Sequence, residues 1–198
     1  MKTYDMEQGS DEWFDIKKGK MSASHAQAIS AQGKGLDTYI HELMSEYYSS
    51  GERDSYSNED MERGIELEAQ AVEMYELENN VKTEKVGFVE LNEYVGCSPD
   101  RLVGEDGMIE VKCPKDKNHF KFLLEGAKAI ESKYIWQMQM QMFITERKYN
   151  IFLSYNPNFK RSLFACRIEI DPAAQAKLKE GFRIGQGLIE GIKKQLND

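Results

Sequence analysis

The sequence predicts a fold of the α/β (α+β) class, with a mixed central β-sheet flanked by helices. Three features predict it. Apolar residues recur at helical spacing through the first 80 residues, strand-like alternation follows between residues 85 and 113, and helix and strand patterns then alternate toward the C-terminus. The chain has 198 residues, of which 40% are hydrophobic, so we expect a single domain over residues 1–198.

Each predicted helix of the N-terminal part follows a polar residue that can cap it. The candidate caps are Ser10 or Asp11, Ser22, Asp37 and Asn58. Their side chains can accept hydrogen bonds from the free N–H groups of a first helical turn. The helix after Asn58 is the longest of them, and its apolar stripe includes Ile65 and Val72. Glu68 falls inside this stripe, where an unpaired carboxylate is costly to bury.

Short strands are predicted in the middle of the chain. They cover residues 85–91, 94–97, 101–103 and 108–113, with a turn at Glu105-Asp106-Gly107 between the last two. Helices from Asn118 and from Ser132 follow, and then strands over 149–155 and 163–170. Each strand is bounded by turn-forming residues, which favours a sheet of short strands over one long element.

Asp171-Pro172 predicts the start of the last helix, because an acidic cap followed by proline is typical of a helix N-terminus. Glycines make this helix intrinsically weak. They stand at positions 181, 185, 187 and 191. They indicate either close packing against another element or a loose C-terminus.

Composition and charge exclude some classes of protein. A membrane-spanning helix needs about 18 uninterrupted apolar residues, and no segment of the chain has them. The first residues also lack the apolar core of a secretory signal. We therefore expect a cytoplasmic protein in which Cys97, Cys113 and Cys166 are reduced. The net charge of −8 argues against a passive coat for nucleic acid. It does not exclude a nuclease, because metal-binding carboxylates add to the acidic count.

One segment brings together side chains that can carry chemistry. Side chains alternate between the faces of a strand, so Glu110 and Lys112 share one face, about 7 Å apart. Ile109 and Val111 point the other way, toward the expected core. The turn before this strand folds the chain back, so that Asp100 lies roughly opposite Glu110. Two carboxylates and an ammonium group are therefore expected at one place.

A pair of carboxylates is the kind of ligand set that Mg²⁺ prefers. Metal bound there can lower the pKa of a water over a scissile phosphate, and Lys112 can position that water, accept its proton or stabilise developing negative charge. Glu68 supplies a third carboxylate, for which a metal is one partner. Spacing alone also allows a simpler interpretation, in which Glu110 and Lys112 form an ordinary solvated pair and Glu68 reaches solvent at a helix edge.

The Asp100…Glu110-Val111-Lys112 pattern resembles the core motif of the PD-(D/E)XK nuclease superfamily. More closely, the chain resembles the lambda exonuclease and YqaJ-like viral recombinase family, the phage-type alkaline exonucleases, from about residue 7 to residue 155. Five segments carry this resemblance in the family's order. They are QGSDEW (8–13), GKMSAS (19–24), GIELE (64–68), CSPD with EVKCP (97–100 and 110–114) and YIWQMQ (134–139). The resemblance implies a restriction-endonuclease-like core.

The resemblance also implies an activity. It implies a 5′→3′ exonuclease that degrades one strand of linear double-stranded DNA, requires Mg²⁺ (for which Mn²⁺ can substitute) and leaves a 3′ single-stranded tail for recombination. Asp100, Glu110 and Glu68 match the metal-binding carboxylates, and a pair of ions is implied at each site. The backbone carbonyl of Val111 adds a ligand. Lys112 matches the catalytic lysine, and Gln137 matches the motif glutamine near the active site.

Four further residues match positions that the family uses to bind DNA. Ser24 and Ser98 match positions around the 5′-phosphate, and Tyr134 lies one helical turn before Gln137 on the same face. Lys17 stands where the family usually has arginine. Lysine keeps the charge but lacks the bidentate fork, so the strength of the 5′-phosphate preference is open. A surface lysine with no such role is an equal interpretation of Lys17.

The resemblance implies a ring-shaped homotrimer around DNA, and a single-strand annealing protein as its partner. The host would be a phage, a prophage or a bacterial cell. Two other functions stay open. One is an endonucleolytic or structure-specific nuclease of the same superfamily. The other is a non-catalytic module that binds DNA ends, which is disfavoured because Glu68, Asp100, Glu110 and Lys112 are all present. The three histidines are expected to be structural or at the surface.

Overall fold

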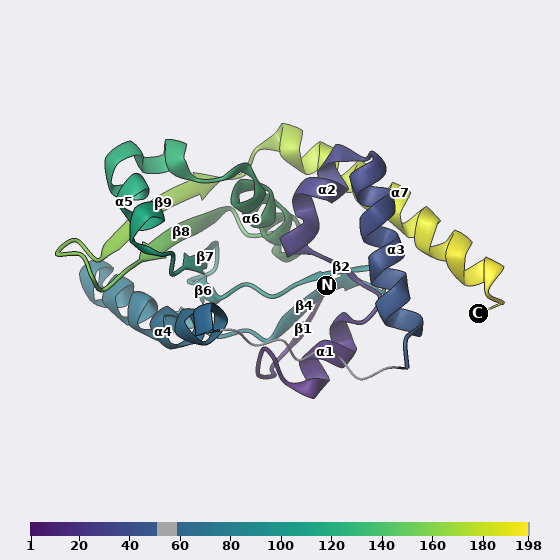
Figure 1. The fold of residues 1–198 in the computed structure, drawn as a ribbon, viewed down its shortest axis with the longest axis horizontal. Helices are drawn as coiled ribbons and strands as arrows, with labels where there is room; N and C mark the ends of the chain where they lie inside the picture. The colour runs from purple at the N-terminus through teal and green to yellow at the C-terminus, as the bar shows by residue number, and fades with distance from the viewer. Residues whose placement is uncertain (51–58, 198) are drawn as a thin grey trace.

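Two mixed β-sheets form the framework of the molecule (Figure 1). The computed structural model describes residues 1–50 and 59–197. The five-stranded sheet has the order β3 (Thr83–Glu84), β6 (Arg101–Val103), β7 (Gly107–Lys112), β8 (Tyr149–Tyr155) and β9 (Leu163–Glu169). The four-stranded sheet has the order β1 (Lys2–Tyr4), β4 (Phe88–Asn92), β5 (Val95–Cys97) and β2 (Met21–Ser22). Each sheet contains one parallel pair, β7 with β8 and β2 with β5.

Helices cover both sheets, which confirms the predicted α/β class. Those before the first long strand are α1 (Asp11–Lys17), the 3₁₀ turn η1 (Ala23–His25), α2 (Ala26–Ala31), α3 (Lys34–Tyr48) and α4 (Glu59–Asn79). Those after it are α5 (Asp116–Glu125), the 3₁₀ turn η2 (Gly126–Ala129), α6 (Ser132–Thr145) and α7 (Pro172–Gln195). Figure 1 shows α4 and α5 beside β8 and β9, and α2, α3 and α7 around the other end of the molecule. No helix of the described residues is long and apolar enough to cross a membrane.

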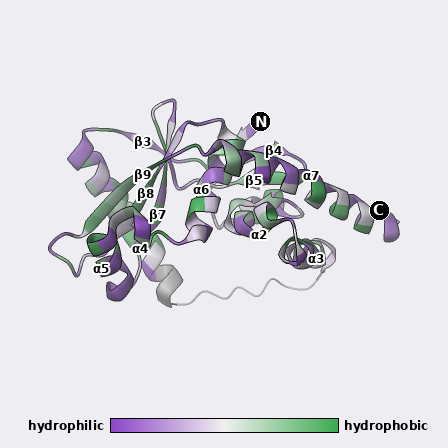
Figure 2. Ribbon diagram, turned by 90° about the horizontal axis from the view of Figure 1, so that it is seen from above, coloured by the Kyte–Doolittle hydropathy of each residue, from purple (hydrophilic) through white to green (hydrophobic). Residues whose placement is uncertain are grey.

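The central strands β7 and β8 of the five-stranded sheet are buried on both faces, because helices pack on each side of them. On one face, Leu67 and Ala71 of α4 join Ile109 and Leu153 in a buried cluster. On the other face, aromatic residues and Met138 of α6 pack around Phe152. Figure 2 shows the resulting hydrophobic residues along β8 and β9. Strands buried on both faces read as continuous apolar runs, which is how this part of β8 reads in the sequence.

Several predicted helix starts are confirmed, whereas three are wrong. Ser10 caps α1 by accepting a hydrogen bond of 3.2 Å from Trp13 N, and Asp171 caps α7 by accepting one of 2.8 Å from Ala173 N. In contrast, α3 begins at Lys34, so Asp37 lies inside its first turn. Likewise α5 begins at Asp116 rather than at Asn118. The third is Ser22, which precedes only the 3₁₀ turn η1 and forms no capping hydrogen bond through its side chain. The predicted cap Asn58 lies outside the described residues.

The apolar stripe of α4 is confirmed at most of its predicted positions, including Val72, and is wrong at Ile65. Leu67, Ala71 and Tyr75 are buried against the sheet at spacings of four residues, whereas Ile65 is 73% exposed. Residues spaced by four lie on one helix face, and Ile65 is two positions away from Leu67, on the outer side. Glu68 follows Leu67 directly, so it lies at the margin of the buried stripe.

The glycines of α7 have two different surroundings. A Cβ at Gly181 would lie 2.2 Å from the backbone oxygen of Ile29 in α2, and one at Gly185 would lie 2.4 Å from Met21 Sδ. A Cβ at Gly187 or Gly191 would meet nothing within 4 Å. The first two glycines therefore allow α7 to pack closely on its neighbours, which is one of the two predicted explanations.

Alanine substitutions in α7 are expected to change stability in opposite directions. Gly181→Ala is expected to lower the free energy of unfolding by about 1–3 kcal/mol, because the new methyl group overlaps α2. Gly187→Ala is expected to raise it by about 0.5–1 kcal/mol, because alanine loses less backbone entropy in an open helical position. Urea unfolding of the two variants measures both changes. A neutral Gly181→Ala would contradict the close packing of α7 on α2.

Candidate active site

The β6–β7 hairpin brings Asp100, Glu110 and Lys112 together, as the sequence predicts. In the antiparallel register of the two strands, Asp100 immediately precedes β6 and lies beside Glu110. Asp100 Oδ2 accepts a hydrogen bond of 2.7 Å from the backbone N–H of Val111. Lys112 Nζ donates to Glu110 Oε1 and forms an ion pair with it. Two carboxylates and one ammonium group therefore converge where β7 ends.

Side chains of α6 surround the Glu110 carboxylate, which is only 1% exposed. Gln137 Nε2 donates to Glu110 Oε1 at 2.7 Å, and Gln141 Nε2 donates to Glu110 Oε2 at 2.6 Å. Tyr134 lies on the same side of α6, with its ring centroid 5.0 Å from Lys112 Nζ. The spacing of these residues, three and then four positions, places them on one helix face. The predicted residues Tyr134 and Gln137 thus lie with the carboxylates and the lysine.

The pKa values of Asp100 and Lys112 are shifted because two carboxylates are buried close together at this site. Burial and then the negative charge of Glu110 raise the pKa of Asp100 well above its usual range. Burial lowers the pKa of Lys112, but the charges of Glu110 and Asp100 outweigh it and raise this pKa above its usual value. Lys112 is therefore protonated at neutral pH and offsets part of the negative charge.

Glu68 approaches the same site from the edge of α4, where its side chain is partly exposed, as the simpler interpretation of the sequence allows. Arg101 Nη1 donates to Glu68 Oε1 at 2.8 Å, and 32% of the Glu68 side chain is exposed. The same Arg101 nitrogen donates to the backbone oxygen of Asp100 at 2.5 Å. The charge of Glu68 also contributes to the raised pKa of Asp100. Glu68 is therefore paired with Arg101 in this structure, at the edge of the carboxylate site.

The acidic residues that the structure describes do not form a ready-made metal cage. Among residues 1–50 and 59–197, no group of three histidine, cysteine, aspartate or glutamate side chains is close enough to hold a metal ion. Asp100 and Glu110 are the carboxylates that the hairpin brings together, and the backbone of Val111 lies directly beside Asp100.

A second group of residues lies around α1, which carries Trp13 and Lys17. The indole Nε1 of Trp13 donates to Ser98 Oγ at 2.8 Å, and Lys17 Nζ lies 3.5 Å from the Trp13 ring centroid. Gln8 Nε2 donates to the backbone oxygen of Pro99 at 3.0 Å. The segment over residues 8–13 is thereby held against the segment that leads to the first carboxylate. Trp13 therefore contacts both Lys17 and Ser98, two of the residues that match the family's DNA-binding positions.

Ser24 belongs to a small polar group at η1. Ser24 Oγ lies 3.0 Å from Ser22 Oγ and 3.2 Å from His25 Nδ1, and the His25 ring stacks on Tyr39 with centroids 4.0 Å apart. Burial lowers the pKa of His25, and the positive charge of Lys17 lowers it further, against the opposing effect of nearby glutamates. The side chain of Ser24 is exposed. The sequence predicts the first turns of a helix at this point, whereas the structure has the three-residue 3₁₀ turn η1.

The pKa of Lys17 is also displaced. Burial lowers it from its usual value to about 8, although the charge of Glu46 acts in the opposite direction. Lys17 therefore changes its charge near neutral pH, unlike a solvent-exposed lysine. Lys17 is half-buried and its ammonium group lies over the Trp13 ring, so it differs from a fully exposed surface lysine.

Sequence reasoning missed two amide side chains and one arginine at the carboxylate site. Gln141 is four residues after Gln137, so the helical spacing could have found it. Asn150 Nδ2 donates to Gln141 Oε1 at 2.7 Å, but it reaches α6 from β8, whose pairing with β7 has no local signal. Arg101 directly follows Asp100, and nothing in its neighbourhood indicates that it pairs with Glu68 of α4.

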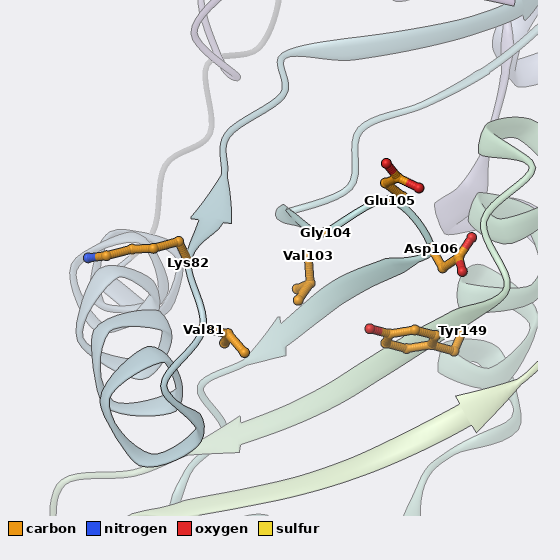
Figure 3. A pocket seen from close by; sticks show the side chains of 7 residues that line it. All are labelled: Val81, Lys82, Val103, Gly104, Glu105, Asp106 and Tyr149. Atoms are coloured by element: carbon orange, nitrogen blue, oxygen red, sulfur yellow. The ribbon is translucent and has the colours of Figure 1, made fainter.

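A hollow of about 450 Å³ lies at the opposite end of the hairpin (Figure 3). The β6–β7 turn, including Gly104 and Asp106, lines it together with Tyr149 and Val81. β7 begins at Gly107, beside this hollow, and ends at Lys112. The hollow is therefore distinct from the carboxylate site.

Solved structures resemble this chain over most of its length. The alkaline exonuclease LHK-Exo from Laribacter hongkongensis is 30% identical, with a TM-score of 0.85 over 95% of this chain and 96% of that chain. LHK-Exo in complex with dAMP is 31% identical, with a TM-score of 0.83 over 95% and 98% of the two chains. A phage related exonuclease from Haemophilus somnus shares the fold at 18% identity, with a TM-score of 0.70 over 89% and 96%.

This fold, with two acidic residues and a lysine on its central hairpin, defines an exonuclease-like nuclease. The model of the YqaJ-like viral recombinase domain matches residues 12–148. The chain therefore belongs to the YqaJ-like viral recombinase domain family, as its motifs predict. Among curated proteins, none matches the sequence significantly.

Proposed function

We propose that this protein is a Mg²⁺-dependent 5′→3′ exonuclease, which degrades one strand of linear double-stranded DNA and leaves a 3′ single-stranded tail for recombination. The observation that carries this proposal is the convergence of Asp100, Glu110 and Lys112 on a fold shared with an alkaline exonuclease. The dAMP complex of LHK-Exo supports exonucleolytic over endonucleolytic cleavage, because a deoxynucleoside monophosphate is what stepwise cleavage of DNA releases.

The donor set suits a hard divalent cation. Asp100 and Glu110 offer carboxylate oxygens side by side, and burial together with the charge of Glu110 raises the pKa of Asp100. A bound cation would favour the charged form of both carboxylates. Asp100, Glu110 and the carbonyl of Val111 would hold Mg²⁺ or Mn²⁺, and Glu68 would join them by exchanging Arg101 for a metal or a bound water. A pair of such ions, when bound, would lower the pKa of a coordinated water and offset charge on the phosphate.

The side chains around the carboxylates have separable roles in this proposal. Lys112, protonated beside Glu110, stabilises the negative charge that develops on the phosphate oxygens. Gln137 donates to the same Glu110 oxygen and holds the carboxylate toward the lysine. Tyr134 provides an aromatic face beside Lys112, suited to contact the DNA end.

The experiment that tests the proposal is digestion of linear duplex DNA carrying a label at either the 5′ or the 3′ end. Early release of the 5′ label, with an uncut closed circle alongside, is the expected result. Cutting of the circle would instead support an endonuclease. Binding without any cleavage, by folded protein supplied with Mg²⁺, would support the non-catalytic end-binding module.

Lys17, Ser24 and Ser98 are proposed to bind the 5′-phosphate of the DNA end. Lys17 supplies positive charge, and the two hydroxyl groups can donate hydrogen bonds to phosphate oxygens. Trp13 contacts both Lys17 and Ser98, and thus fixes two of these groups against each other. Figure 1 shows α1, which carries Lys17, close to β1 and β4.

The preference for 5′-phosphorylated ends is expected to fall as the pH rises. Lys17 has a pKa of about 8, so it loses its positive charge above that pH. A bound phosphate favours the charged form and therefore raises the pH at which the charge is lost. Cleavage rates on 5′-phosphate and 5′-hydroxyl ends, compared between pH 7 and 10, measure the effect. Lys17→Arg is the control, because arginine stays protonated and should keep the preference throughout. A ratio independent of pH in the wild-type protein would contradict the role of Lys17.

Assembly and partnership are proposed from family membership alone. We propose a homotrimer that encloses DNA, and a single-strand annealing protein that receives the 3′ tail. Sedimentation equilibrium tests the first part, since a mass other than three times that of the chain would exclude the ring.

A further inference from the structure

A chain of two buried amides stands behind the Glu110 carboxylate, on the side away from Lys112. Gln141 of α6 and Asn150 of β8 are both fully buried. Gln141 Nε2 donates to Glu110 Oε2 at 2.6 Å, and Asn150 Nδ2 donates to Gln141 Oε1 at 2.7 Å. Thr145 Oγ1 donates to the backbone oxygen of Gln141 at 2.8 Å and ties this turn of the helix further.

The order of these hydrogen bonds is set by the charge of Glu110. Asn150 Oδ1 is buried and has no hydrogen-bond partner among the described residues, which costs free energy. If both amides were turned over, Asn150 Oδ1 would accept from Gln141. The oxygen of Gln141 would then face the oxygen of Glu110, and a carboxylate cannot donate. The unpaired oxygen at the far end is therefore the cost of presenting an N–H group to Glu110.

The two oxygens of Glu110 consequently have different surroundings. Oε2 accepts from Gln141, which is inaccessible to solvent. Oε1 accepts from Lys112 and Gln137, both of which are partly exposed. Lys112 and Gln137 can move away from Oε1 when a cation arrives, whereas Gln141 is held in place by Asn150.

We propose that Gln141, oriented by Asn150, is a positioning residue that holds Glu110 Oε2 and thereby directs Oε1 toward the metal ion. This inference rests on the proposed metal-dependent nuclease function. It adds two residues to the site, Gln141 and Asn150, that lie outside the sequence motifs. A residue that orients a ligand in this way typically contributes a factor of about 10–100 in metal affinity.

The chain offers a matched control on the same helix. Gln139 is 2% exposed, and its Nε2 donates to the backbone oxygen of Glu169 at 2.8 Å. Its Oε1 accepts from the backbone N–H of Asp171 at 3.0 Å. Gln139 therefore ties α6 to the end of β9 and the start of α7, and its side-chain hydrogen bonds are directed away from Glu110. Loss of this buried amide tests what a purely structural glutamine contributes.

The experiment compares Gln141→Met, Asn150→Leu and Gln139→Met with the wild-type protein. Mn²⁺ binding is measured by calorimetry without DNA, and folding by thermal unfolding in EDTA. The Mn²⁺ concentration for half-maximal cleavage is measured separately from the rate at saturation. Gln141→Met is expected to weaken Mn²⁺ binding about 10-fold or more, with a matching rise in the half-maximal concentration. Asn150→Leu is expected to act in the same direction, because the amide of Gln141 is then free to turn.

Gln139→Met is expected to lower the unfolding temperature and to leave Mn²⁺ affinity unchanged. The double variant of Gln141 and Asn150 should bind Mn²⁺ no more weakly than Gln141→Met, because Asn150 acts only through Gln141. If Gln141→Met does not fold, Asn150→Leu decides the question alone. Wild-type affinity in the folded variants would overturn this inference but leave the nuclease intact. Absence of Mn²⁺ binding and cleavage in the wild-type protein would overturn the proposed function and this inference together.

Discussion

Lys112→Ala is expected to abolish DNA cleavage while leaving the fold and the affinity for DNA largely intact. The Lys112 ammonium group lies against Glu110 and under the ring of Tyr134, where it can stabilise charge that develops only during the reaction. Removal of one such group typically lowers a turnover rate by about 10²–10³. Single-turnover cleavage, with duplex binding measured in Ca²⁺ in place of Mg²⁺, separates the two effects.

Lys148, which precedes β8 and pairs with the turn of the β6–β7 hairpin, provides the control for this variant. Lys148 Nζ forms an exposed ion pair of 2.9 Å with Asp106, next to the β6–β7 turn. Lys148→Ala should cleave at the wild-type rate, because an exposed pair of this kind contributes little to stability and lies away from the carboxylates. Near-normal turnover in Lys112→Ala would remove this lysine from the mechanism.

Asp100→Asn is expected to have the second large effect. It should abolish metal binding and cleavage but raise the stability of the metal-free protein. An asparagine oxygen can still accept the hydrogen bond from Val111 N, so the local backbone is preserved. The substitution removes one of two buried carboxylates that repel each other, so the free energy of unfolding in EDTA is expected to rise. Metal affinity and cleavage are expected to be lost, because a neutral amide is a much weaker ligand for Mg²⁺.

Unfolding experiments with and without metal make this prediction specific. Mn²⁺ should stabilise the wild-type protein, since a ligand that binds only the folded state raises the free energy of unfolding. The same ion should not stabilise Asp100→Asn. Equal stabilisation of both proteins, or unchanged metal affinity in calorimetry, would contradict the assignment of Asp100 as a ligand.

The central hairpin could be predicted closely because its signals are local. Side-chain alternation and the turn over 105–107 give β6 without error and β7 to within one residue at either end, and they place Asp100 beside Glu110. The same alternation predicts that Ile109 and Val111 face the core, as they do. The geometry of the two carboxylates thus follows from a few adjacent residues and from strand geometry.

Features that depend on distant partners could not be predicted. β1 and β2 are short, with no strand signal of their own, and they exist because β4 and β5 offer them hydrogen bonds. The pairing of Glu68 with Arg101 depends on how α4 lies across the sheet. Asn150 reaches Gln141 only because β8 runs parallel to β7, a pairing that closes a long loop through α5 and α6.

The most direct test of the account is release of mononucleotides from linear duplex DNA by the wild-type protein, in Mg²⁺ and in EDTA, with Asp100→Asn alongside. We expect steady release in Mg²⁺, none in EDTA, and none from the Asp100 variant under either condition. Release that continues in EDTA, or that survives in Asp100→Asn, would contradict a metal-dependent exonuclease at the Asp100–Glu110–Lys112 site.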